Sequence, residues 1–97
     1  MTPPSIELAH IPGCPHADEA RRNLAAALRG AGLQVRWTEW DLESPSTPAR
    51  VRTFGSPTVL VDGRDVTGAE QGVGARAPAC RVEGAPTVEQ IAALLVR

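Results

Sequence analysis

Residues 10–20 read HIPGCPHADEA and place one of only two cysteines, Cys14, between two prolines where a helix is expected to begin. The preceding residues 5–11, SIELAHI, are mostly apolar and β-branched near both ends, which is typical of a short buried strand. After the proline–glycine turn, apolar residues recur at helical spacing and acidic residues occupy the first turn, so we expect a helix over 15–29. The stretch therefore predicts a strand, a tight turn that carries a thiol, and a helix in direct succession.

The rest of the chain continues this alternation of strands and helices. Residues 33–42 form a candidate second strand, in which Trp37 and Trp40 fall on opposite faces because their spacing is odd, and both are interpreted as packing residues. The remaining predicted elements are a short helix over 48–54, a hairpin of strands 58–61 and 64–67 turned by Asp62 and Gly63, and a last helix opened by a capping box of Thr87 and Gln90. On the short helix, Arg50 and Arg52 are interpreted as solvated charges, one of which could meet an anionic substrate.

This order of elements predicts an α/β fold, with a four-stranded mixed sheet flanked by three helices on both faces, in a single domain of residues 1–97. Because helices join the first three strands, we expect these strands to be mainly parallel with right-handed crossovers. The two-residue turn makes the fourth strand antiparallel to the third. Residues 68–86 fit no regular element, and a loop of that length in so small a domain is usually functional or mobile.

The composition narrows the classes of function. Ten arginines, no lysine and eleven acidic residues give a net charge of −1, which provides no basic footprint for nucleic acid. The first residues lack the regions of a signal peptide and no apolar run is long enough to span a bilayer, so we expect a cytoplasmic protein without a membrane partner. In that compartment, two cysteines indicate reduced thiols, redox groups or metal ligands rather than a structural disulfide. We expect a monomer with no cofactor. We also expect no bound metal, since the cysteine spacing matches no known zinc pattern.

Cys14 is the first candidate for chemistry. The N–H groups and the dipole at the start of a helix favour a thiolate, and a protonated His16 would add to that effect. Such a thiolate can attack a disulfide sulfur at a rate set by its thiolate fraction and its accessibility. Two plainer interpretations stay open, namely Cys14 as a vestigial residue at a helix cap and His16 as an ordinary exposed residue at a helix start.

Two motifs, GCPHA at 13–17 and GSPTVLVDG at 55–63, together resemble the thioredoxin-like superfamily in its small, glutaredoxin-sized form. The resemblance implies a thioredoxin-like fold in which the peptide bond before Pro57 is cis and its turn lies close to the cysteine. It also implies that the backbone of Ser56, Pro57 and Thr58 binds an extended thiol substrate. A plainer interpretation of the proline, as a rigid turn before a strand, is compatible with that role.

The resemblance implies that the chain is a thiol–disulfide oxidoreductase-like protein. It would act through Cys14 on a thiol-containing small molecule or a protein disulfide. Whether the chain turns over as an enzyme stays open. The alternative is a thioredoxin-fold binding module that holds a thiol ligand or a soft metal such as mercury without turnover. The pattern GSPTV with a later CRV is also similar to small thioredoxin-like proteins found beside mercury-resistance genes.

The second cysteine, Cys80, completes the candidate set. The dithiol enzymes of the family have Cys-x-x-Cys, whereas here the fourth position is Ala17, so Cys80 is a candidate resolving thiol. The fourth strand is expected to deliver the chain to the Pro57 end of the sheet, from which the glycine-rich loop can fold over Cys14. The other interpretation makes Cys80 a small buried apolar residue in a short strand. The predicted catalytic residues are therefore Cys14, His16 and Cys80.

Overall fold

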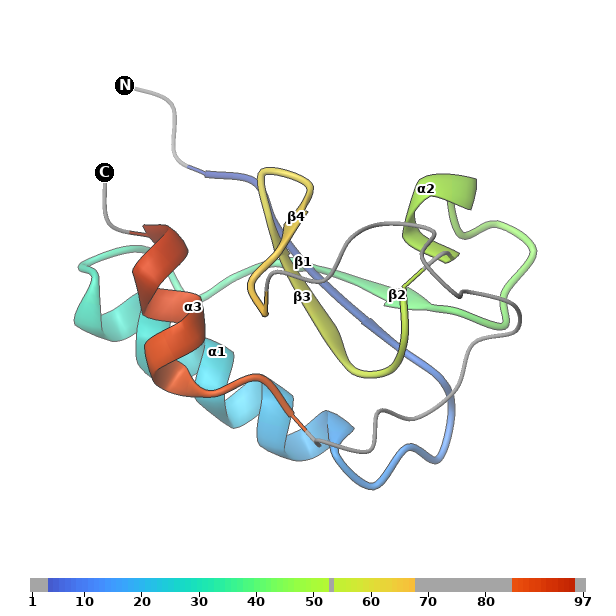
Figure 1. Cartoon of the computed structure of the whole chain (residues 1–97), viewed down its shortest axis with the longest axis horizontal. Coiled ribbons are helices and arrows are strands. Elements are labelled where there is room, and N and C mark those ends of the chain that lie inside the picture. The colour runs from blue at the N-terminus through green and yellow to red at the C-terminus, as the bar shows by residue number, and fades with distance from the viewer. Residues whose placement is uncertain (1–3, 53, 68–84, 96–97) are drawn as a thin grey trace.

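The computed structural model describes residues 4–52, 54–67 and 85–95. Its elements follow the predicted order of strand, helix, strand, helix, strand, strand and helix (Figure 1). They are β1 (Ile6–His10), α1 (Ala17–Gly30), β2 (Thr38–Asp41), α2 (Ala49–Arg52), β3 (Thr58–Val61), β4 (Arg64–Asp65) and α3 (Val88–Leu95). The fold is thus α/β, with a four-stranded mixed sheet and three helices, as the sequence predicts.

The sheet has the strand order β2-β1-β3-β4, and only β1 and β2 are parallel. Strand β3 runs antiparallel to β1, so the prediction of three mainly parallel strands is wrong. A parallel β3 would require α2 to carry the chain back along the sheet, and this helix has only four residues and is about 6 Å long. The chain therefore enters β3 at the end of the sheet where β2 stops, with Thr58 opposite Ala9.

Helices cover both faces of the sheet (Figure 1). Helices α1 and α3 pack together on one face, and α2 lies on the other. An apolar core lies on each face of the sheet, and β1 and β3 contribute to both because successive side chains point to opposite faces. Leu8 and Val59 point to one face, while Ala9 and Leu60 point to the other. The core under α1 and α3 contains Ile6, Leu8, Ala20, Leu24, Ala27, Leu28, Val59, Val61, Val66, Ile91 and Leu95. The smaller core under α2 contains Ala9, Leu42, Val51, Phe54 and Leu60.

Local signals locate the ends of the later elements well. Asp62 and Gly63 both have positive φ values, 53° and 82°, as the predicted two-residue hairpin turn requires. At the start of α3, the Thr87 N–H donates to Gln90 Oε1 at 2.9 Å and the Gln90 N–H donates to Thr87 Oγ1 at 3.1 Å. These reciprocal bonds confirm the capping box.

The second strand is shorter than predicted, because β2 begins at Thr38 rather than at residue 33. Residues 33–37 leave the sheet, and the Arg36 N–H bonds locally to the Gln34 carbonyl at 3.0 Å. Leu33 and Trp37 instead pack against the core under α1, while Trp40 packs against the core under α2. The two tryptophans therefore lie on opposite faces, as their spacing predicts.

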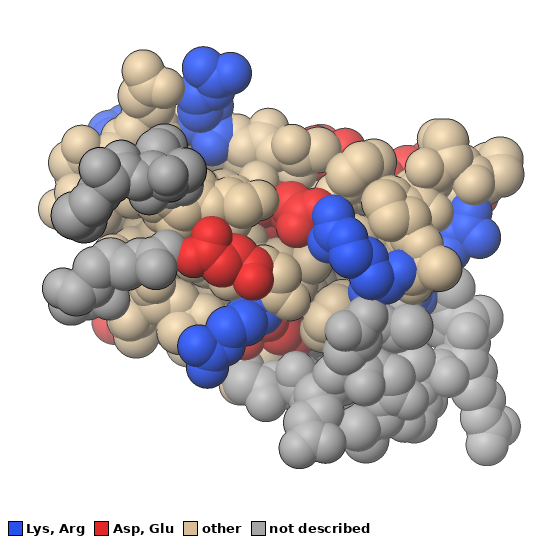
Figure 2. All heavy atoms as spheres, turned by 90° about the horizontal axis from the view of Figure 1, so that it is seen from above, with Lys and Arg blue, Asp and Glu red and all other residues tan. Residues whose placement is uncertain are grey.

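The charged side chains are mixed on the surface. On the face shown in Figure 2, arginine and acidic side chains lie near one another rather than in separate fields of one sign. Among the described residues, no helix has the length and apolar character needed to cross a membrane.

Candidate functional site

Cys14 lies in the tight turn between β1 and α1. Gly13 has a φ of 77°, a conformation that favours glycine, and this turn lets the Cys14 N–H donate to the Ile11 carbonyl at 3.2 Å. The Cys14 carbonyl accepts a bond from the N–H of Ala17, the first residue of the helix, at 3.2 Å. The side chain is buried, with 8% of the residue exposed. The thiol thus stands in the turn that leads into a 14-residue helix, three residues before the first helical residue, Ala17.

A second turn, before β3, lies at the same end of the sheet. The Ser56–Pro57 peptide bond is cis, as the resemblance implies. The Ile11 N–H donates to Ser56 Oγ at 2.9 Å, so the turn that carries Cys14 is bonded directly to the turn that carries Pro57. The antiparallel pairing of β1 with β3 causes this proximity, because it sets the end of β1 beside the start of β3.

The predicted substrate-binding backbone is enclosed. Ser56, Pro57 and Thr58 are fully buried, and Thr58 Oγ1 donates to the Gly55 carbonyl at 2.5 Å. The three residues therefore lie at the same end of the sheet as the Cys14 turn, but they are not displayed on the surface.

Of the other two predicted catalytic residues, His16 and Cys80, the structure describes only His16. His16 precedes α1 as its N-cap residue, is half-buried, and makes no side-chain capping bond. Cys80 lies outside the described residues. Strand β4 does run back toward the start of β3, since the Val66 N–H donates to the Val59 carbonyl at 3.1 Å, so the chain reaches Thr67 near the Pro57 end, as predicted.

A polar cluster that the sequence analysis did not identify lies on the α1 face of the sheet. Arg21 donates to Glu39 through Nη2 at 2.8 Å and through Nε at 3.1 Å, and it also pairs with Asp18 at 2.5 Å. The Trp37 Nε1–H donates to Glu39 Oε1 at 3.2 Å, and His10 Nε2 lies 3.2 Å from Glu39 Oε2. Hydrogen bonds from Arg21, followed by that from Trp37, lower the pKa of Glu39 to about 2 against the effect of its partial burial. We call these residues the Glu39 cluster.

A matching cluster lies on the opposite face. Glu7 accepts bonds from Arg50 Nη2 at 2.8 Å and Nη1 at 3.2 Å, and from Trp40 Nε1 at 2.8 Å. The hydrogen bond from Arg50 lowers the pKa of Glu7, assisted by Trp40 and opposed by burial. We call this the Glu7 cluster. Arg50 is therefore a partner of a buried carboxylate rather than the solvated helix charge predicted from sequence, although half of its side chain remains exposed.

One sequence signal does point to the Glu7 cluster. Glu7 interrupts an apolar strand, and a carboxylate that is buried there needs a cationic or hydrogen-bonding partner. Only arginine supplies fixed positive charge in this chain, but the sequence does not say which of ten arginines is the partner.

The described residues contain no group of three or more histidine, cysteine or acidic side chains arranged to hold a metal ion. A cavity of about 700 Å³ lies at the far end of the sheet, beside Ser5 and Trp37, and so does not belong to the Cys14 turn. Comparison with protein-family models, curated proteins and solved structures gives no match.

Proposed function

We propose that the chain is a thioredoxin-like protein that carries out thiol–disulfide exchange through Cys14. The observation that carries this proposal is the bond from the Ile11 N–H to Ser56 Oγ, which holds the thiol turn beside the cis-proline turn. The strand and helix order and the position of Cys14 in the turn that precedes α1 also support it. Helix starts of this kind favour a thiolate, although the effect declines beyond the first turn and apolar burial opposes it.

The proposed reaction has two exchange steps. The Cys14 thiolate attacks one sulfur of a disulfide, the S–S bond breaks, and the departing thiolate takes up a proton. This leaves a mixed disulfide on Cys14. A second thiol, either Cys80 or an external thiol, loses its proton and attacks the Cys14 sulfur of the mixed disulfide. That S–S bond breaks, the second half of the substrate leaves as a thiolate that takes up a proton, and Cys14 is left in a disulfide with the attacking thiol. Cys14 and the second thiol thus supply the two electrons that reduce the substrate, and a further external thiol reduces their disulfide.

The first test is the pKa of the Cys14 thiol. We expect Cys14 in a Cys80→Ser variant to alkylate with a midpoint below the ordinary cysteine value of about 8.5. The measurement is the rate of iodoacetamide modification against pH, with Cys14→Ser as the matched variant that reports Cys80 alone. A midpoint at or above the ordinary value, or faster modification of Cys80, would contradict an activated Cys14.

The second test is catalysis. Reduction of bis(2-hydroxyethyl) disulfide by glutathione should be accelerated by the full chain and lost in Cys14→Ser. Retained activity in Cys80→Ser would assign the second step to the external thiol, whereas its loss would assign that step to Cys80. Stoichiometric uptake of Hg²⁺ without any accelerated exchange would replace the proposal by the alternative of a binding module.

A further inference from the structure

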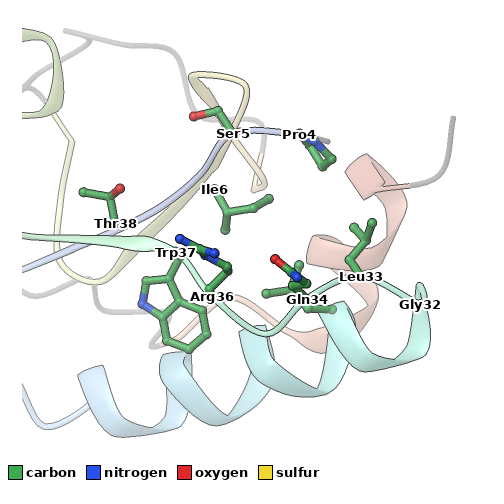
Figure 3. A pocket seen from close by; sticks show the side chains of 10 residues that line it. Pro4, Ser5, Ile6, Gly32, Leu33, Gln34, Arg36, Trp37 and Thr38 are labelled. Carbon is green, nitrogen blue, oxygen red and sulfur yellow. The ribbon is translucent and has the colours of Figure 1, made fainter. Parts of the chain in front are cut away.

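The cavity at the far end of the sheet lies between the start of β1 and the connection from α1 to β2 (Figure 3). It exists because β2 pairs with β1 only from Thr38 onward, opposite Glu7. Residues 33–37 stand away from the edge of the sheet and leave a hollow of about 700 Å³. This volume is within the usual range of small-molecule sites, about 300–1,000 Å³.

The inner wall of the cavity is apolar. Ile6 and Leu28 contribute from β1 and α1, and Leu33 and Trp37 contribute from the connection. Figure 3 shows Ile6 on β1 and Trp37 on the connection, with the Arg36 side chain drawn between them. The hydrogen bond from Trp37 to Glu39 fixes the indole, so this part of the wall is ordered before a ligand arrives.

One positively charged side chain contributes to the lining of the cavity. Among the described residues, Arg36 is the one charged residue that lines the cavity, and no aspartate or glutamate lines it. Arg36 is exposed and, among the described residues, forms no ion pair, in contrast to Arg21 and Arg50. The cavity thus combines an apolar wall with a guanidinium that is available to an anion.

We propose that this cavity binds a small amphiphilic carboxylate, with its apolar tail against Trp37 and Leu33 and its carboxylate on Arg36. The site is separate from the Cys14 turn, because it adjoins the start of β1 whereas Cys14 follows the end of that strand. The proposal therefore stands or falls independently of thiol–disulfide exchange.

The experiment titrates the full chain with sodium octanoate and follows the two indole N–H signals by NMR, with calorimetry for the affinity. The Trp37 signal should shift in a saturable way while the Trp40 signal, from the opposite face, stays in place. Arg36→Gln should weaken octanoate binding about tenfold, as expected for loss of a charge-assisted contact. Arg22→Gln, which removes an exposed arginine of α1 outside the cavity, should leave the affinity unchanged.

A neutral probe separates the contribution of the charge from that of the apolar wall. Binding of 1-octanol should be the same in the full chain and in Arg36→Gln. The proposal is overturned if millimolar octanoate leaves the Trp37 signal unmoved, if both indoles shift equally, or if Arg36→Gln binds octanoate as well as the unmodified chain. The unchanged Trp40 signal of Arg36→Gln verifies that the variant is folded.

Discussion

The two faces of the sheet carry the same trio of side chains in different surroundings. In each cluster, a strand glutamate accepts bonds from a helix arginine and from a tryptophan indole. The Glu7 side chain is 7% exposed and the Glu39 side chain is 35% exposed. Similar hydrogen bonds can therefore make different contributions to stability. If the bonds were lost, water could replace the partners of Glu39 far more easily than those of Glu7.

Among the tests of this difference, substitution of the two glutamates should have the largest effect on the free energy of unfolding. Glu7→Ala should lower the free energy of unfolding by about 3 kcal/mol, since it leaves the Trp40 N–H without its acceptor and opens space in the α2 face. Glu39→Ala should lower it by about 1 kcal/mol, because its partners can turn to solvent. Urea unfolding followed by circular dichroism measures both values.

Glu43→Ala is the matched control for these substitutions, because Glu43 is exposed on the loop after β2 and no side-chain bond of Glu43 is found among the described residues. It should change the free energy of unfolding by no more than about 0.5 kcal/mol. If Glu39→Ala destabilised the chain as much as Glu7→Ala, the argument from exposure would be wrong.

The indole donors should give a smaller difference in the same direction. Trp40→Phe removes the 2.8 Å bond to the buried Glu7 and should cost about 1.5 kcal/mol. Trp37→Phe removes the 3.2 Å bond to the more exposed Glu39 and should cost about 0.5 kcal/mol. Equal losses in the same unfolding experiment would show that packing of the rings, rather than their N–H bonds, dominates.

The pH dependence of stability should give the smallest effect. The pKa of Glu39 is lowered from an ordinary value of 4.5 to about 2, so its ionised form stabilises the fold above about pH 4.5. That contribution is lost as the pH falls toward 2. We expect Glu39→Gln to reduce the loss of stability over this range by about 0.5 kcal/mol, because solvent screens a side chain that is one-third exposed.

The measurement compares urea midpoints of Glu39→Gln and the unmodified chain at several pH values within that window. Glu7→Gln provides the counterpart on the other face, since the pKa of Glu7 is also lowered and its ionised form likewise stabilises the fold at higher pH. If the urea midpoint of Glu39→Gln fell with pH as steeply as that of the unmodified chain, Glu39 would not titrate differently in the folded and unfolded chain.

At the end of the sheet that carries the Cys14 and Pro57 turns, some predictions from the sequence were correct and one was wrong. The tight turn before α1 was predicted from a short motif, the cis bond at Pro57 was implied by the resemblance, and both are present. The direction of β3 was predicted wrongly, because a helical connection does not by itself fix whether the next strand is parallel. The correct direction sets the turn that carries Cys14 beside the turn that carries Pro57, whereas a parallel β3 would place its start at the opposite end of the sheet.

The sequence by itself determined the features that depend on a few neighbouring residues. The hairpin turn at Asp62 and Gly63 and the capping box at Thr87 need only backbone conformation and nearby side chains, so short patterns specify them. The order of helices and strands follows from hydrophobic periodicity for the same reason.

Only the tertiary structure decided which distant groups meet. Ile11 bonds to Ser56 across 45 positions and Glu7 bonds to Arg50 across 43, and several other hydroxyls and arginines have the same chemistry. The direction of β3 and the stacking of α1, α2 and α3 on the two faces select among them. Each such contact is the outcome of packing the whole sheet, because a buried polar group takes the partner that the fold brings within hydrogen-bonding distance.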